Sequence, residues 1–321
     1  MRLLRWLSLA FLFAALGVPA ASAQTYPAWP IRLVVPFAAG GPADFLGRVI
    51  GQKLGETLGQ QIVVDNRPGA NTILGAQAVA RADPDGYTLL MAIDGTLVMN
   101  PFLYSKLPYD ASKDFEPISL IAFVPSAFVA NNGVPAKTLP ELITQEKAKP
   151  GTYLIGSSTP TTQVGIELLN MLAGIKFGIV PYKGGSTQVS GLLGGEIPIG
   201  VESFNVALPL YRAGQLKVLA VMTPARLSLA PEITPIGEIY PGYDLGIWQS
   251  IVAPAGISRE VIGRLSAAIK AVLSDQELRQ KILNAGIEPA FSNSPQEFAA
   301  FVRAQAETRS KVIRAIGLKL D

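Results

Sequence analysis

Short apolar runs alternate with amphipathic segments along most of the chain. The apolar run at 31–36 is typical of a strand that is buried on both faces. We expect Asp44 to cap a helix that continues to about Leu58 and buries its apolar side. Similar patterns predict strands at 62–64, 88–93, 153–157, 177–182, 197–201 and 216–221, and helices at 71–81, 138–149, 161–172, 188–193 and 206–212. Because strands alternate with helices, the pattern predicts an α/β fold with parallel strands.

Two long apolar stretches bear on how the chain is divided. The residues after 258 are mainly helical, with helices expected at 259–273, 276–284 and 295–316. The stretches 117–129 and 244–254 are apolar and lack a clear helical period, so we interpret each as an extended crossing between two lobes. This places 24–124 and 248–321 in a discontinuous first lobe and 125–247 in a second lobe. The pattern alone does not decide this division.

The first 23 residues have the three parts of a secretory signal peptide. Arg2 and Arg5 form a positive start, an apolar run extends from Trp6 to Val18, and small residues end at Ala23. A membrane anchor is the alternative, but the apolar run is shorter than the roughly 20 residues that span a bilayer. We therefore predict cleavage after Ala23 and a mature protein in the periplasm.

The composition removes several classes of function. The chain has no Cys and no His, which excludes disulfides, thiolate nucleophiles, Cys-ligated zinc and Ser-His-Asp triads. Without the two arginines of the signal segment, 25 basic residues stand against 24 acidic ones. This balance, with no basic cluster, argues against a nucleic-acid partner. The sequence also lacks a G-x-S-x-G elbow and a Walker A lysine, so we predict no enzyme activity, no metal site and no cofactor.

A glycine-rich loop at 37–44 is the most informative local feature. It joins the first apolar strand to the first amphipathic helix, so it lies at the carboxyl end of a strand, where ligands bind in parallel sheets. Its glycines allow close approach of the backbone, and the amides at the helix start favour an anion. The alternative is a plain strand-to-helix turn that Asp44 caps. The loop lacks the G-x-G-x-x-G pattern of a dinucleotide site.

Two further strand-to-helix loops have similar chemistry. The loop at 156–163 is rich in hydroxyl groups that can donate to carboxylate oxygens, although helix capping explains them equally well. The loop at 181–186 contains Lys183, which is either a cation for a ligand or an ordinary surface lysine. Asp94 directly follows a predicted strand and can face the same cleft. Three such loops without a catalytic constellation favour a binding protein over an exported hydrolase or lyase that uses Asp94 or Glu202.

Seven motifs in fixed order resemble one protein family. They are VPFAAGGPAD at 35–44, VDNRPGAN at 64–71, DPDGYTLL at 83–90, PYKGG at 181–185, LLGGE at 192–196, LAV at 219–221 and IVAPAGIS at 251–258. Over essentially the whole mature chain they resemble the Bug-type receptors, the extracytoplasmic solute-binding components of tripartite tricarboxylate transporters. The resemblance implies a type II periplasmic binding protein fold, in which two α/β lobes joined by two crossing strands enclose a ligand cleft.

The resemblance also implies which residues bind a ligand. Family members hold one ligand carboxylate largely by backbone amides of the first glycine-rich loop, which match Phe37, Gly41, Ala43 and Asp44. The full set of candidates in the first lobe is Phe37, Ala38, Gly40, Gly41, Ala43, Asp44 and Asp94. The candidates in the second lobe are Ser157, Ser158, Thr159, Gln163, Lys183, Gly184, Gly185 and Glu202. Family members commonly carry other residues where Ala43, Asp94, Gln163 and Glu202 stand, which affects the identity of the ligand rather than the transport role.

We therefore expect a monomeric periplasmic receptor that captures a small organic acid and delivers it to a tripartite tricarboxylate transporter permease. A sensor that acts through another membrane partner is the alternative, because the sequence does not separate transport from sensing. Helix starts on both lobes favour a dicarboxylate of about four to eight carbons. If Asp94 and Glu202 face the cleft ionised, they would repel a third carboxylate. They would also welcome an ammonium group, which makes an acidic amino acid the second candidate.

Overall fold

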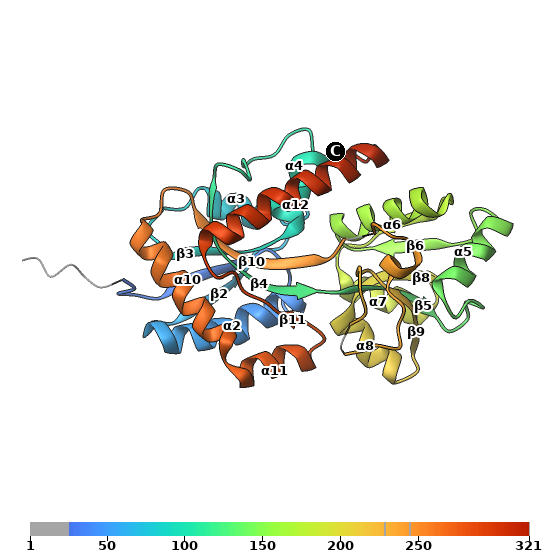
Figure 1. Ribbon diagram of the computed structural model, residues 1–321, viewed down its shortest axis with the longest axis horizontal. Coiled ribbons are helices and arrows are strands. Elements are labelled where there is room, and N and C mark those ends of the chain that lie inside the picture. Colours follow the sequence, from blue (N-terminus) through green and yellow to red (C-terminus); the bar gives the residue numbers. More distant parts are fainter. Residues whose placement is uncertain (1–25, 228, 244, 321) are drawn as a thin grey trace, which may run out of the picture.

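The computed structural model describes residues 26–227, 229–243 and 245–320. The predicted signal peptide at 1–23 lies outside these residues. The described chain forms two sheets that lie side by side along the long axis of the molecule, each with helices on both faces (Figure 1). No helix in these ranges is long and apolar enough to cross a membrane.

The first sheet has six strands in the order β11-β4-β10-β3-β1-β2. They are β1 (Ile31–Val35), β2 (Ile62–Asn66), β3 (Thr88–Ile93), β4 (Phe115–Val124), β10 (Ile247–Pro254) and β11 (Glu288–Pro289). One face packs against α2 (Pro42–Leu58), α10 (Arg259–Ser274) and α11 (Gln276–Asn284), and the other against α3 (Ile73–Ala80), α4 (Asn100–Leu103) and α12 (Pro295–Ile316). Leu33 and Val34 of β1 belong to the cores of opposite faces, which explains why the whole strand is apolar.

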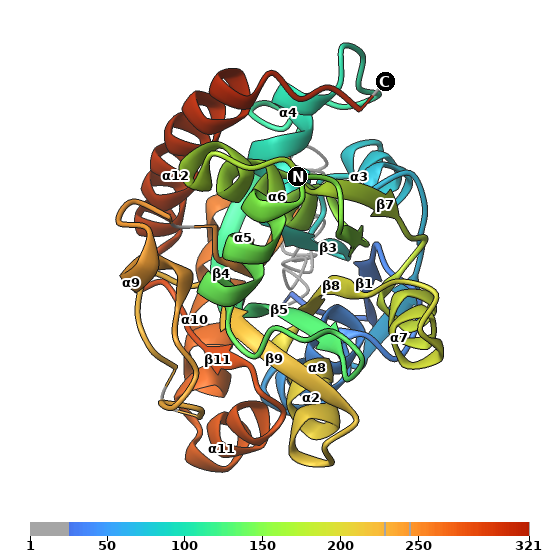
Figure 2. The ribbon, with the colours of Figure 1, turned by 90° about the vertical axis from the view of Figure 1, so that its right-hand side faces the viewer.

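The second sheet has five strands in the order β7-β6-β8-β5-β9. They are β5 (Ser126–Asn131), β6 (Leu154–Ser157), β7 (Gly178–Pro181), β8 (Ile199–Ser203) and β9 (Leu216–Val221). On one side of β5 and β8 lie α5 (Leu139–Ala148) and α6 (Pro160–Ala173), and on the other α7 (Gly185–Gly194) and α8 (Phe204–Arg212) (Figure 2). The short helix α9 (Ile236–Ile239) lies between β9 and β10 in the chain.

The chain passes between the two sheets twice. β4 continues into β5 with only Pro125 between them, and the segment after α9 leads back into β10. Figure 1 shows β4 and β10 side by side where they run toward the second sheet. The division into two lobes that move as units stays a prediction, with 24–124 and 248–321 in the first lobe and 125–247 in the second.

The expectation of purely parallel strands is wrong for the strands near the crossings. β10 pairs antiparallel with β3 and β4, and β5 pairs antiparallel with β8 and β9. A strand that arrives from the other lobe enters the sheet at the carboxyl ends of the strands in the local strand–helix–strand units. It therefore runs against those units, which a local sequence pattern does not reveal.

This connection makes the carboxyl ends of both sets of strands face each other. In the first sheet β1 and β3 are parallel, and β4 runs the same way because β10 is antiparallel to both β3 and β4. In the second sheet β6, β7 and β8 are parallel to one another, and β8 is antiparallel to β5. β4 therefore ends where β1 and β3 end, and β5 begins where β8 ends. The strand-to-helix loops of both lobes consequently border the same interlobe space.

One cluster of buried apolar side chains extends through both lobes. It includes Leu90 and Phe298 of the first lobe and Phe128 and Leu169 of the second. Two other clusters stay within one lobe each, beneath α2, α10 and α11 in the first and beneath α7 and α8 in the second. The lobes thus share a dry core on the side where α12 contacts α6.

Several short elements have no counterpart in the sequence analysis. They are the π-helix η1 (Gly95–Met99), α4, α9 and β11. β8 also ends at Ser203 rather than at 201, which makes Glu202 part of the strand. Each missed element is too short for its apolar residues to show a period.

A close backbone contact positions the glycine-rich loop. Gly75 in α3 lies against Pro36, which separates β1 from the loop. A Cβ atom at Gly75 would be 2.7 Å from the Cβ atom and 3.1 Å from the Cα atom of Pro36. The absence of a side chain at Gly75 therefore allows α3 to pack this close to the start of the loop.

We expect Gly75→Ala to lower the free energy of unfolding by about 1–3 kcal/mol, because the added methyl group forces Pro36 or α3 to move. Gly263→Ala is the matched control, since Gly263 is exposed within α10 and an added Cβ atom there meets no heavy atom within 4 Å. That substitution should raise stability by about 0.5–1 kcal/mol through helix propensity. Urea unfolding followed by circular dichroism measures both, and equal stabilities would contradict the close contact.

Candidate functional site

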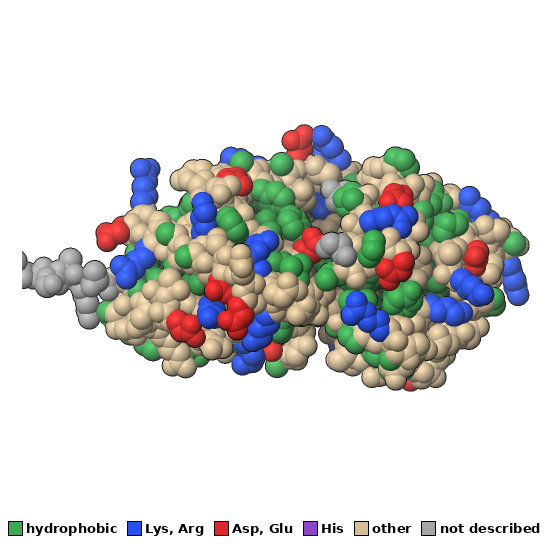
Figure 3. Space-filling model, turned by 60° about the horizontal axis from the view of Figure 1, so that its bottom comes forward, with side chains coloured by type: hydrophobic (Ala, Val, Ile, Leu, Met, Phe, Trp, Pro, Cys, Tyr) green, Lys and Arg blue, Asp and Glu red, His purple; other side chains and the backbone are tan. Residues whose placement is uncertain are grey.

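The loops singled out in the sequence meet at the interlobe space. In the first lobe, residues 36–41 join β1 to α2, and Asp94 follows β3. In the second lobe, residues 158–159 join β6 to α6, and residues 182–184 join β7 to α7. On the surface, a furrow separates the two lobes along the lower edge of Figure 3. No group of three or more Asp and Glu side chains in the described part of the chain is placed to hold a metal ion.

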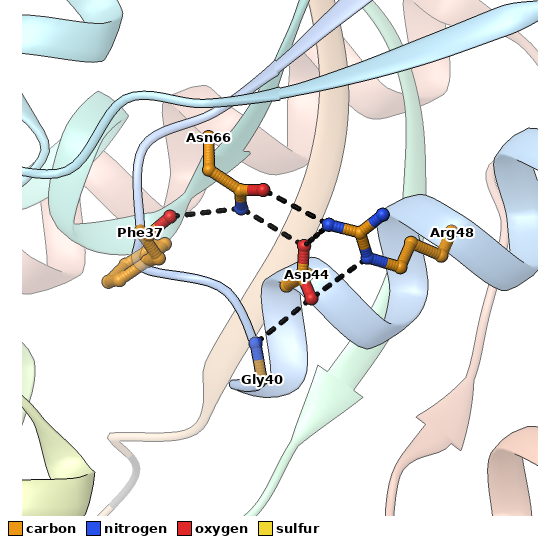
Figure 4. Close-up of polar contacts among 5 residues, drawn as sticks. All are labelled: Phe37, Gly40, Asp44, Arg48 and Asn66. Carbon is orange, nitrogen blue, oxygen red and sulfur yellow. Dashed lines mark hydrogen bonds and ion pairs between the residues drawn. The ribbon is translucent and has the colours of Figure 1, made fainter.

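Asp44 ties the glycine-rich loop to α2 and β2 (Figure 4). Its Oδ2 atom accepts hydrogen bonds from the Gly40 amide at 2.9 Å and from Nε of Arg48 at 3.0 Å. Its Oδ1 atom accepts a hydrogen bond from Nδ2 of Asn66 at 3.0 Å and lies 2.8 Å from an Arg48 nitrogen. Asn66 also donates to the carbonyl oxygen of Phe37 at 3.1 Å. These five residues form one network that fixes both ends of the loop.

Asp44 is not the N-cap that the sequence pattern predicted. α2 begins at Pro42, its N-cap is Gly41, and Asp44 is the third residue of the helix. From there the carboxylate reaches back over the first turn, where negative charge is favoured by the helix dipole. Burial opposes ionisation, but the hydrogen bonds from Arg48, Gly40 and Asn66 outweigh it and hold the pKa of Asp44 below its usual value. The side chain is therefore a structural acceptor.

The backbone amides at the start of α2 are left for another acceptor. Among the described residues, none accepts a hydrogen bond from the amides of Gly41, Ala43 or Asp44. The first amide of the helix that has a partner is that of Phe45, which donates to the carbonyl of Gly41 at 2.9 Å. Free amides at a helix start are suited to an anion such as a carboxylate.

The remaining first-loop candidates have different environments. Ala38 and Gly40 are exposed, and Gly40 has already committed its amide to Asp44. Phe37 is half-buried, with its side chain packed against the apolar cluster beneath α2. The loop therefore presents an apolar surface beside its amides.

The hydroxyl groups of the second loop cap α6. Thr159 is the N-cap, and it exchanges two hydrogen bonds with Thr162: Oγ1 accepts from the Thr162 amide at 3.2 Å, and its own amide donates to Thr162 Oγ1 at 3.1 Å. Ser157 donates to the carbonyl of Thr159 at 3.2 Å. Interactions at the start of α6 thus account for the hydroxyl groups of Ser157 and Thr159, two of the three that were predicted. The amides of Ser158 and Thr161, by contrast, have no acceptor among the described residues.

The third loop presents a cation and a helix start without a side-chain cap. Lys183 is exposed and forms no ion pair within the described ranges. Gly184 is the N-cap of α7. Gly185 lies against Glu202, where an added Cβ atom would be 2.8 Å from Oε1. Gln163, in the first turn of α6, is half-buried, and no described residue hydrogen-bonds its side chain.

Two carboxyl groups at the strand ends are buried rather than open to a cleft. Asp94 is completely buried and accepts a hydrogen bond from Oγ1 of Thr161 at 3.0 Å. Glu202 is 4% exposed and accepts one from the amide of Ser203 at 2.9 Å. Burial raises the pKa of Asp94 to about 6 and that of Glu202 to about 7. Both carboxyls are thus less ionised near neutral pH than the sequence suggested, which weakens the expected repulsion of a third carboxylate.

Sequence reasoning missed three residues that shape the site. The spacing of Asp44 and Arg48 by four residues in a predicted helix is a readable sign of an ion pair. Asn66 ends an apolar strand next to β1, which is a weaker sign. The contact of Thr161 with Asp94 joins residues that are 67 apart in the chain, and no local pattern predicts it.

Comparison with known proteins relates the chain to transporter receptors. The profile of the tripartite tricarboxylate transporter family receptor matches residues 46–318. The chain is 32% identical over 323 residues to protein BugT of Bordetella pertussis, which covers 99% of this chain and 98% of that protein. The structure of R. palustris Rpa4515 with adipate matches with a TM-score of 0.87 and 31% identity, over 92% of this chain and 99% of that one. MatC from Rhodopseudomonas palustris with bound malate matches with a TM-score of 0.82 and 28% identity, over 90% and 100%.

We expect Asp44→Ala to lower the free energy of unfolding by about 2–3 kcal/mol, because it leaves Arg48, Asn66 and the Gly40 amide without their shared acceptor. Glu307→Gln is the control: it removes an exposed ion pair with Lys311 in α12 and should leave the free energy of unfolding nearly unchanged. Denaturant midpoints for the two variants and the wild type test this difference. Similar small losses in both would show that the network does not hold the loop.

The same carboxylate should make stability depend on pH. Because the folded pKa of Asp44 lies below its unfolded value, its contribution is present above about pH 4 and is lost as the pH falls through the folded pKa. The stability difference between the wild type and Asp44→Asn should therefore shrink below about pH 4. A difference that stays constant from pH 7 to pH 3 would contradict the low pKa.

Proposed function

The chain belongs to the tripartite tricarboxylate transporter family of receptors, and on this premise we propose that it captures a linear dicarboxylate and delivers it to the membrane permease of such a transporter. The family consists of transporter binding proteins and not of enzymes, and its solved structures have the two-lobed α/β fold. The prediction of a binding protein rather than an enzyme and the prediction of the fold are therefore confirmed. We propose further that residues 1–23 are a signal peptide, that the mature receptor works in the periplasm, and that it is a monomer.

The pair of free helix starts at the facing edges of the two lobes carries the proposal. α2 offers the amides of Gly41, Ala43 and Asp44, and α6 follows the free amide of Ser158. Both helices begin with proline, whose fixed φ angle suits the first helical position. A carboxylate at such an end gains about 0.3–1 kcal/mol from the helix dipole, in addition to its charge-assisted hydrogen bonds. A molecule with a carboxylate at each end would use both lobes.

Two relatives support this class of ligand. The structure of Rpa4515 was determined with adipate and that of MatC with malate, and both molecules are dicarboxylates. In this chain, the half-buried Phe37 ring lies in the first loop, and Ala43 offers no hydroxyl group beside the loop amides. We therefore propose a dicarboxylate of about four to eight carbons in total, with few hydroxyl groups on its spacer.

We expect adipate to bind at least about tenfold more tightly than hexanoate, because the monoacid leaves one helix start to water and forgoes at least about 1.4 kcal/mol. Citrate should bind more weakly than adipate, since two carboxylates already occupy the helix starts of α2 and α6 and the desolvation of a third one is an added cost. Isothermal titration calorimetry at a single pH near 7.5 gives all three affinities. Equal affinity for hexanoate and adipate would refute the use of two loops.

The second lobe can be tested separately through Lys183. Lys183→Ala should weaken adipate binding by about threefold to tenfold, and the loss should shrink at high salt because an exposed charge is screened. Lys147→Ala is the matched control, since Lys147 is an exposed lysine on α5, away from the three loops. If both variants bind adipate like the wild type, Lys183 is an ordinary surface lysine.

A further inference from the structure

One buried hydrogen bond joins the two lobes at the base of the interlobe space. Thr161, in the first turn of α6, donates from Oγ1 to Oδ2 of Asp94, which follows β3, at 3.0 Å. The elements that the two residues follow, β3 and β6, belong to different sheets, and both residues are completely buried. The backbone amide of Thr161 is one of the free amides described above, but its hydroxyl group is paired with the Asp94 carboxyl group. Neither side chain is therefore needed to explain how a carboxylate is held.

The surroundings of this hydrogen bond are closely packed and mostly apolar, and Arg309 of α12 is the charged group that acts on it. Gly95 begins η1 so close to α6 that an added Cβ atom would lie 3.6 Å from Oγ1 of Thr161. Leu97 of η1 and Val164 of α6 belong to the apolar cluster that runs through both lobes. Oδ1 of Asp94 is buried without a hydrogen-bond partner among the described residues. The bond to Thr161 is therefore the hydrogen bond that the carboxyl group makes with a side chain of the other lobe, and it is fully buried.

We propose that Thr161 and Asp94 form a latch that holds the two lobes together when the receptor closes over its ligand. The inference rests on the proposed function, because a latch serves a receptor whose lobes open and close. When the lobes part, the hydroxyl and the carboxyl group return to water. When the lobes meet, one hydrogen bond between the two side chains replaces their hydrogen bonds to water. Such a bond is stronger in a buried, low-dielectric environment than at a surface. Asp94 is in this account a positioning residue that does not touch the ligand.

The latch makes closure depend on pH. With the lobes together, burial raises the pKa of Asp94 to about 6, whereas a hydrated aspartate in open lobes has a pKa of about 4. Arg309 of α12 is the charged group that acts on Asp94, and its charge and the Thr161 hydrogen bond favour the ionised form without offsetting burial. Closure thus takes up a proton between about pH 4 and pH 6. It is most favourable below that window and weakens, by up to about a hundredfold, as the pH rises through it.

The experiment measures lobe closure directly and uses the absence of native cysteine. Spin labels on Gln52→Cys of α2 and Ser190→Cys of α7 report the distance between exposed positions on the two lobes by double electron–electron resonance. The distance distribution is recorded without ligand and with adipate, in the wild type and in Thr161→Val, Asp94→Ala, Asp94→Asn and the double variant Thr161→Val/Asp94→Ala. Thr144→Val, an exposed threonine of α5, is the control for the loss of a hydroxyl group.

We expect Thr161→Val and Asp94→Ala each to shift the distribution toward longer distances, with no further shift in the double variant. Asp94→Asn should show at pH 7.5 the distribution that the wild type has at pH 4.5, because the amide oxygen accepts the same hydrogen bond without a buried charge. The wild-type distribution should move toward longer distances between pH 4.5 and pH 7, and that of Asp94→Asn should not move. Adipate affinity should fall about tenfold in Thr161→Val and stay unchanged in Thr144→Val.

A wild-type distribution in Thr161→Val, or a full pH response in Asp94→Asn, would overturn the latch. Normal adipate binding with unchanged distances in both latch variants would reject the latch and leave the proposed function standing. Expected distance changes without any adipate binding would instead count against the proposed ligand and support the latch. Thermal unfolding of each variant confirms that it is folded before its distances are compared.

Discussion

The direct passage of β4 into β5 through Pro125 is the constraint on which the site depends. Because a strand has a direction, this single connection decides which ends of the strands in each sheet face the other lobe. β4 ends where β1 and β3 end, and β5 begins where β8 ends. Loops that are more than a hundred residues apart in the chain therefore border one space. The return through β10 adds a second crossing beside the first.

Within this frame, the two lobes prepare their helix starts in different ways. In the first lobe the buried carboxylate of Asp44 accepts hydrogen bonds from Gly40, Arg48 and Asn66. The loop is thereby fixed, while the amides of Gly41 and Ala43 stay free. In the second lobe the hydroxyl groups of Thr159 and Thr162 cap α6. Both arrangements fix the backbone before a ligand arrives, and amides that are already ordered lose little entropy when they bind an anion.

The sequence predicted the parts of this molecule that depend on neighbouring residues. A continuous apolar run showed the strand at 31–36, the helical pattern of the C-terminal part showed the helices after 258, and seven ordered motifs indicated the family. It did not show that β10 and β5 run antiparallel, because strand direction depends on where the chain crosses. Asp44 was placed in the correct loop with the wrong role, since its role depends on α2 beginning at Pro42. The buried hydrogen bond of Asp94 is with Thr161, a residue from the other lobe that no local pattern places beside it.

The most direct test of the central claim is a backbone amide titration by nuclear magnetic resonance, since the claim is that one diacid is held by amides of both lobes. Labelled protein is titrated with adipate and then with hexanoate, and the shifts of the Gly41, Ala43 and Ser158 amides are followed. With adipate, amides of both loops should shift together with one affinity. With hexanoate, the amide signals of one loop should shift, while those of the other loop should keep the chemical shifts of the ligand-free protein. Shifts confined to one lobe with adipate, or to residues outside both loops, would contradict the account.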